Sequence, residues 1–151
     1  GWISFNCADT ADNCASSSYG TRTTFYGPPE EATLTSSVFD TGADIGGASF
    51  NTIMWVGEQP VGTPSGNRVR FQLKSSNNDD ADLRNEINFI GPGGTSGVCD
   101  YYNPSQPGDQ AIINREFHDD HRYIRYKVFI FSDDTNTISP KVDEILINYG
   151  Q

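Results

Sequence analysis

Two histidines give this chain its most direct candidate for metal chemistry. His118 and His121 flank two aspartates in the sequence His-Asp-Asp-His. Neutral imidazoles and carboxylates are ligands for Zn²⁺ or Ni²⁺, but a site needs a further protein ligand, and the sequence indicates none. We therefore favour a polar turn that leads into the strand beginning at Arg122.

Aspartates in loops raise the question of a second metal. Asp79, Asp80 and Asp82 lie in one acidic, Asn-rich loop. Carboxylates and loop carbonyls are the ligands of Ca²⁺, although EF-hand spacing is lacking. Solvated loops that keep the protein soluble are the simpler interpretation. The sequence requires no cofactor, and a structural calcium ion at these three aspartates stays open.

No combination of residues predicts catalysis. A hydrolase needs paired carboxylates in a cleft, or a nucleophile with a base and an orienting group. Carboxylates are plentiful, but none lies at a strand position with such neighbours, and Cys99 has no adjacent Lys, Arg or His to activate its thiol. The glycine-rich residues 91–97 match neither a phosphate-binding loop nor a dinucleotide fingerprint. We expect a protein that is not an enzyme.

Aromatic residues near loops suggest a different use. Tyr101 and Tyr102 precede Asn103, and sugar-binding modules combine flat aromatic faces with amide and carboxylate hydrogen bonds. These three residues are therefore candidate glycan contacts. The alternative, which we favour, is that the two rings belong to the core or pack under a loop.

Cysteine usage points to an oxidising compartment. Cys7 and Cys14 enclose a short polar loop, and a disulfide between them would stabilise the fold by about 2 kcal/mol in the chain-entropy model. Cys99 is left over, either as a buried thiol or as the partner of another chain or of a missing segment. No apolar run approaches the length of about 18 residues that crosses a membrane. If the protein is exported, we expect this chain to be a processed form or an excised fragment.

Composition favours short strands joined by many turns. The 151 residues suit one domain, 1–151, and include 12% aromatic residues, 15 Gly and 8 Pro. The net charge of −10 and the pI of about 4.4 disfavour binding to nucleic acid and to anionic lipid.

The first seven residues alternate with period two. Ile3, Phe5 and Cys7 share one face, and Trp2 lies on the other. We expect a strand that, with the disulfide loop, forms an N-terminal extension over residues 1–26. Because this strand looks exposed, Trp2, Ile3 and Phe5 are expected to add to the sheet edge of a neighbouring subunit.

The other segments with strand-like composition are residues 21–26, 32–39, 49–56, 67–75, 87–90, 98–102, 111–117, 122–131 and 141–149. In residues 67–75, apolar and basic side chains alternate, so one face packs and the other is wet and basic. The last segment, 141–149, is apolar enough for a central strand covered on both sides. This spacing, with no helical periodicity, predicts an all-β fold: an antiparallel β-sandwich, jelly-roll or discoidin-like, of about seven to nine strands with little or no helix.

Basic side chains lie on the expected strands while acidic ones lie in loops. The basic strand residues are Arg68, Arg70, Arg122, Arg125 and Lys127. A basic sheet face beside acidic rims is self-complementary and could hold identical subunits together. The alternative is a solvated face with cross-strand charge pairs.

Two groups of segments resemble known bacterial proteins. Residues 1–7, followed by Cys14 and by Ser-Tyr-Gly at 18–20, resemble the Trp-Ile-Ser-Phe-Asn-Cys segments of secreted and surface proteins of ultra-small candidate-phylum bacteria. The second group is similar to β-sandwich modules at the C-terminal side of prepilin-like surface proteins and to the discoidin-like, galactose-binding-like sandwich group. Its segments are residues 34–42, 53–55, 69–73, 91–94, 122–127 and 140–142.

The resemblance implies a sandwich at the bacterial cell surface, outside the cell, and carries over no active site. We therefore expect an extracellular structural module of a surface appendage or filament, such as a pilin-like subunit or adhesion module, that acts through homotypic contacts. The expected partners are further copies or other surface proteins, without nucleic acid and without a membrane-spanning segment. The alternative is a carbohydrate-binding module with a glycan as its partner.

Overall fold

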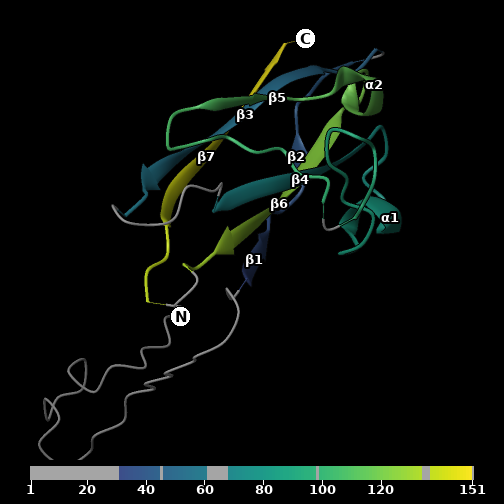
Figure 1. Cartoon of the computed structure of the whole chain (residues 1–151). Coiled ribbons are helices and arrows are strands. Elements are labelled where there is room, and N and C mark those ends of the chain that lie inside the picture. Colours follow the sequence, from purple (N-terminus) through teal and green to yellow (C-terminus); the bar gives the residue numbers. More distant parts are fainter. Residues whose placement is uncertain (1–30, 45, 61–67, 98, 134–136, 151) are drawn as a thin grey trace, which may run out of the picture.

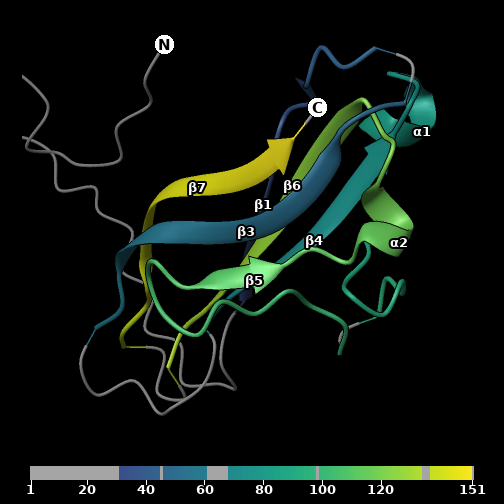
Figure 2. The same ribbon diagram turned by 90° about the horizontal axis from the view of Figure 1, so that it is seen from above.

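The computed structural model describes residues 31–44, 46–60, 68–97, 99–133 and 137–150. In these residues, seven strands form two antiparallel sheets that lie face to face (Figures 1 and 2). The prediction of an all-β antiparallel sandwich with little helix is therefore confirmed. Among the described residues, none of the helices is long and apolar enough to span a membrane.

The first sheet is built around β6 (Tyr123–Phe131). β4 (Val69–Ser76) pairs along one side of β6 over its whole length. β1 (Glu31–Thr35) and β2 (Phe39–Asp40) pair one after the other along the opposite side. Residues 32–39, predicted as one strand, are thus two strands separated by Ser-Ser-Val, and together they form one edge of this sheet.

The second sheet has the order β5–β3–β7. β3 (Ser49–Glu58) lies in the middle, with the short β5 (Gln110–Ile112) on one side and β7 (Lys141–Gly150) on the other. The expectation that the terminal strand is central is wrong for the described residues, in which β7 pairs only with β3. Apolar content predicted burial on both sides, but the order of strands in the sheet decides which strand lies at the edge.

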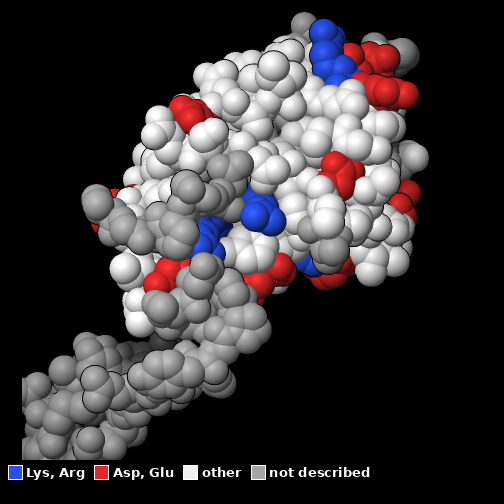
Figure 3. Space-filling model, in the orientation of Figure 1, with Lys and Arg blue, Asp and Glu red and all other residues white. Residues whose placement is uncertain are grey.

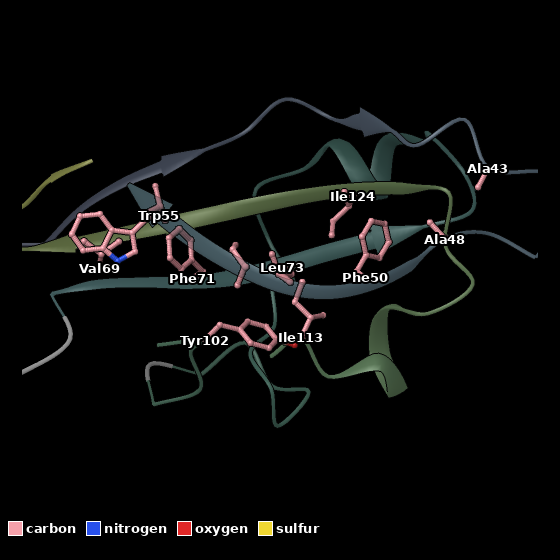
Figure 4. Close-up of a cluster of buried hydrophobic side chains, with 12 residues drawn as sticks. Ala43, Ala48, Phe50, Trp55, Val69, Phe71, Leu73, Tyr102, Ile113 and Ile124 are labelled. Carbon is pink, nitrogen blue, oxygen red and sulfur yellow. The ribbon is translucent and has the colours of Figure 1, made fainter. Parts of the chain in front are cut away.

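The core lies between the two sheets and follows the period-two pattern of the strands. The side chains of Phe50, Ile53 and Trp55 on β3 meet those of Phe71 and Leu73 on β4 (Figure 4). All five are fully buried. On β4 they alternate with polar residues, whereas on β3 an irregularity between Phe50 and Thr52 lets Phe50 and Ile53, three residues apart, face the same core. The partly buried residues that pack against this core are Ala111, Tyr126, Ile130, Val142, Ile145 and Ile147.

Two predicted strands are wrong as strands. In residues 87–90 and 98–102 the structure has only single bridges, from Ile90 to Leu73 and from Tyr102 to Phe71. Glycine follows the first segment, at Gly91, and precedes the second, at Gly97. Both bridges join the loop of residues 77–109 to β4, the other edge of the first sheet.

Two short helices lie where a loop and part of a strand were predicted. The strand predicted over residues 111–117 ends at Ile112. The helix α2 (Arg115–His118) follows, and the Asn114 side chain caps its start by accepting a hydrogen bond from the Glu116 N–H. α1 (Ala81–Arg84) begins after Asp80, which caps it in the same way. The predictions of one domain over 1–151 and of an extension over 1–26 include residues outside the described ranges and stay predictions.

Candidate functional site

The side chains of the two histidines share a hydrogen-bond partner, the hydroxyl group of one serine. The hydroxyl of Ser75 on β4 lies 2.8 Å from Nδ1 of His118 and 2.7 Å from Nδ1 of His121. Burial lowers the pKa of His118 to about 4, with a further contribution from His121, so this imidazole is neutral at neutral pH. These hydrogen bonds therefore connect β4 to the turn that precedes β6. Within the described ranges, no group of three potential ligands surrounds them.

The three aspartates of the calcium prediction have separate partners. Asp79 pairs with Arg84 at 2.5 Å, and this hydrogen bond lowers the pKa of Asp79. Asp80 accepts from the backbone N–H groups of α1, and Asp82 lies 3.6 Å from Nζ of Lys74. Calcium would have to displace these partners, and its binding stays a prediction.

The predicted glycan contacts are divided between the interior and the surface. Tyr102 is 2% exposed and belongs to the core, where its hydroxyl accepts from the Asn114 N–H at 3.3 Å (Figure 4). Tyr101 is 7% exposed and packs edge-on against Phe129 at a centroid distance of 4.9 Å. Asn103 is exposed, and its amide donates to the Tyr101 carbonyl. The two rings are thus packed as in the alternative that we favoured.

A hollow of about 340 Å³, here named the outer hollow, lies on the outer face of the first sheet. Tyr101 lines it together with Phe89 and Phe129. Its polar lining consists of Glu31, Gln72, Glu86, Asn88, Ser96 and Lys127. Aromatic rings beside amides and carboxylates are the combination that suits a sugar, so Tyr101 keeps a place in a candidate glycan site through this hollow rather than through an exposed ring.

The basic outer face of the first sheet is only partly wet, contrary to expectation: Arg70 and Lys127 are half-buried. Lys74 and Arg125 are each 7% exposed because the loop that contains α1 covers them. The ammonium group of Lys74 donates to the carbonyls of Asp82 and Ile87, and Arg125 donates to those of Leu83 and other residues at the end of α1. Each buried charge thus has several oxygen partners, as the burial of a cation requires.

Among the described residues, nothing covers the sandwich along the edge formed by β1, β2 and β7, here named the uncovered edge. Phe39 on β2 reaches Tyr149 on β7, with ring centroids 5.9 Å apart, and the two are 52% and 36% exposed. Leu34 pairs with the buried Val128, and so points to the inner side of the first sheet, yet it is 56% exposed. Large apolar side chains on an inner face are normally covered. No described strand lies over this part of the first sheet.

A second hollow, here named the edge hollow, opens at this edge and measures about 300 Å³. Phe39 and Tyr149 line it with Ile145 and Ile147 of β7. Ile124 and Tyr126 of β6, together with Phe50, contribute from the core side. The hollow is therefore a gap between the two sheets at their shared edge, with predominantly apolar walls.

Sequence reasoning missed Leu34 and Phe39 as surface residues. Both were predicted to lie in one strand over residues 32–39, in which alternation would put residues 34 and 39 on opposite faces. The break between β1 and β2 instead places both on the inner face, opposite Val128 and Ile124. The sequence pattern did not indicate how wide the opposite sheet is. Among the described strands that sheet ends at β7, which leaves both side chains uncovered. The doublet Ser36-Ser37, which ends β1, was the only local signal of a break.

The remaining predicted residues lie in part outside the described ranges. Cys7 and Cys14, with the assembly residues Trp2, Ile3 and Phe5, are among them. Cys99 is described and exposed, so the interpretation as a buried thiol is wrong. Its pairing with another chain stays a prediction.

Comparison of the chain with models of protein families, with curated proteins and with solved structures finds no match. The resemblance to bacterial surface proteins therefore stays a prediction, and the functional argument depends on the geometry described above.

Proposed function

We propose that this protein is an extracellular structural module of a bacterial surface appendage or filament and that it acts through homotypic contacts. The observation that carries the proposal is the uncovered edge of the sandwich. Leu34 and Phe39 face inward from the first sheet without a described strand opposite them. Fully burying an exposed side chain of this kind contributes about 1.5–3 kcal/mol. Leu34 and Phe39 are 56% and 52% exposed, so a contact that covers both gains about the value of one full burial.

Edge strands normally carry features that prevent pairing with other chains. Prolines, bulges and inward-pointing charges serve this purpose. β7 is ten residues long and contains no proline, and its three charged residues, Lys141, Asp143 and Glu144, are confined to its first half. Its second half, from Ile145 to Gly150, offers uncharged backbone next to the edge hollow. Such an edge suits a module that assembles.

The distribution of charge supports contact through apolar rather than ionic surfaces. On the face shown in Figure 3, acidic and basic side chains are scattered among much larger uncharged areas. The basic residues expected to form a self-complementary face include Arg125, which is buried inside its own subunit. We therefore place the homotypic contact at the uncovered edge and not on that face.

A matched pair of variants tests this proposal. Leu34→Glu introduces a charge into the uncovered edge, whereas Ile112→Glu introduces the same charge at an 80% exposed position on β5, at the opposite edge of the second sheet. We expect the wild type to form oligomers or filaments in light scattering and negative-stain microscopy. Leu34→Glu should be monomeric with an unchanged melting temperature, and Ile112→Glu should still assemble. A monomeric wild type at high concentration, or assembly lost only in Ile112→Glu, would overturn the proposal.

A carbohydrate-binding module is the second candidate, and the outer hollow is the observation that favours it. Asn88 has a φ of 63° and contributes to the polar lining of the hollow. Glycine accepts this backbone conformation without strain, so Asn88→Gly removes the amide and leaves the loop intact.

A glycan array with the wild type is the first measurement for this candidate. If the outer hollow binds a sugar, Asn88→Gly should weaken retention of that sugar about tenfold or more, because about 1.4 kcal/mol corresponds to a factor of ten and a hydrogen bond contributes about that much. The matched control is Asn103→Gly, which removes an exposed amide outside the hollow. An array without any bound glycan, or equal loss in both variants, would rule out the outer hollow as the site.

A further inference from the structure

We propose that the uncovered edge is filled by residues 1–7 of a second copy of this chain, which lie along β7 as an added strand. The inference rests on the proposed homotypic function and names its partner segment. The backbone of β7, the shape of the edge hollow and the sequence of residues 1–7 each support it.

The backbone of β7 is oriented to accept a strand. On β3 the carbonyl of Trp55 accepts from the N–H of Gly108, on the β5 side. The N–H and C=O groups of successive residues in a strand point to opposite sides of that strand. The N–H and C=O groups of Met54 therefore point away from β5, toward its β7 partner Leu146. Ile145 and Ile147, the neighbours of Leu146, therefore direct their N–H and C=O groups away from β3, to the side on which no described strand pairs.

The same two residues turn their side chains inward. Ile145 and Ile147 pack against the core and line the edge hollow. A strand added beside them would continue the second sheet by one position, over the part of the first sheet that carries Leu34 and Phe39. Its inward side chains would enter the gap between the sheets, so the acceptor requires apolar residues at every second position.

Residues 1–7 have this pattern. Ile3, Phe5 and Cys7 share one face, Trp2, Ser4 and Asn6 share the other, and the segment carries no charged side chain. The chain has a net charge of −10, so an uncharged strand is the kind that a second copy can present without electrostatic repulsion. Seven residues span about 23 Å as a strand, which is shorter than the ten-residue β7.

Other segments outside the described ranges fit the acceptor less well. Residues 61–67 contain a proline and two glycines and have a single large apolar side chain. Residues 21–26 lie directly before Gly-Pro-Pro at 27–29 and include Arg22, and their alternation is weaker. Residues 1–7 precede the start of β1 by more than 20 residues, a length that lets them reach a neighbouring subunit.

The period of the strand supplies a matched pair of variants in the full chain. Ile3→Glu places a charge on the face that would enter the edge hollow, and Ser4→Glu places the same charge on the opposite face. In reducing buffer, which excludes disulfide links through Cys99, we expect Ile3→Glu to be monomeric and Ser4→Glu to assemble like the wild type. A wild type that assembles together with an Ile3→Glu variant that assembles equally well would overturn the inference and leave the proposed function standing.

Mixing two variants tests whether the strand is exchanged between copies. The Leu34→Glu variant has an intact donor strand, residues 1–7, and a blocked acceptor edge. The Ile3→Glu variant has a blocked donor strand and an intact acceptor edge. Each should be monomeric alone, and a mixture should give a one-to-one complex of twice the 16.6 kDa chain mass, because only one of the two possible contacts is intact. Two monomeric variants that form no complex when mixed would overturn exchange between copies. A monomeric wild type would instead overturn the proposed function itself.

Discussion

At the scale of single residues, burial changes the chemistry of side chains that the sequence presents as polar. His118 is 1% exposed, and its Nε2 atom has no hydrogen-bond partner in the described part of the chain. Its ring centroid lies 6.3 Å from that of Tyr102, and its Nδ1 atom lies 2.8 Å from the Ser75 hydroxyl, which also reaches Nδ1 of His121. A charged imidazole at this place would be poorly solvated, which is why its pKa lies well below the value of about 6.5 for an exposed histidine.

This burial predicts a loss of stability in mild acid. The pKa of His118 is about 4 in the folded protein, while the unfolded chain binds the proton near pH 6.5, so the unfolded state takes up more protons as the pH falls through this window. The free energy of unfolding, measured with urea, should fall by about 2 kcal/mol from pH 7 to pH 5.

The effect belongs to the imidazoles rather than to the acids. Asp40, whose carboxylate accepts from Arg122 and from the Gly42 N–H, has its pKa lowered to about 2 and loses its contribution only at lower pH. A His118→Gln variant should show a smaller fall between pH 7 and pH 5, the remainder coming from His121, whose pKa burial also lowers. A free energy of unfolding that is constant over this range in the wild type would contradict the prediction.

At the scale of elements, the first sheet is covered on its outer face by a loop that two cations hold in place. The last carbonyls of a helix have no partner within the helix, and Arg125 donates to those of α1. Lys74 donates to Asn85 and Ile87 in the following residues. The loop therefore docks through its backbone, while Leu83 and Phe89 supply its buried apolar contacts.

Replacing one of these cations should destabilise the loop. Lys74→Met keeps most of the aliphatic stem but leaves the Asp82 and Ile87 carbonyls without their donor, so the free energy of unfolding should decrease by about 1–3 kcal/mol. Lys141→Met is the control, because the Lys141 side chain is 65% exposed and should change the stability by less than about 0.5 kcal/mol. Urea unfolding of the two variants measures the difference, and equal values would show that the Lys74 hydrogen bonds do not stabilise the docked loop.

At the scale of the whole molecule, the two sheets differ in width along one edge. The first sheet extends through β1 and β2, and the second ends at β7 (Figure 2). This difference leaves Leu34 and Phe39 uncovered and opens the edge hollow. The predictions for Leu34→Glu and Ile3→Glu follow from it, since one variant alters the acceptor and the other the proposed donor.

Local patterns in the sequence were sufficient for the fold class. Period-two alternation predicted β4, and runs of apolar, aromatic and β-branched residues predicted β3, β6 and β7, each within a few residues of the observed bounds. Turn residues separated these strands correctly. The weakest predictions were short segments next to a glycine, such as residues 87–90 before Gly91, where a single bridge forms instead of a strand.

The sequence by itself determined the all-β class, the positions of the long strands β3, β4, β6 and β7, and the apolar face of β4. Only the tertiary structure decided that Lys74 and Arg125 are buried, that Tyr102 is a core residue, and that β7 lies at an edge of the described sheet. These properties depend on which distant segment covers a residue, and contacts between segments far apart in the chain leave no periodic signal in either segment. The uncovered edge, on which the proposed function depends, is a property of this kind.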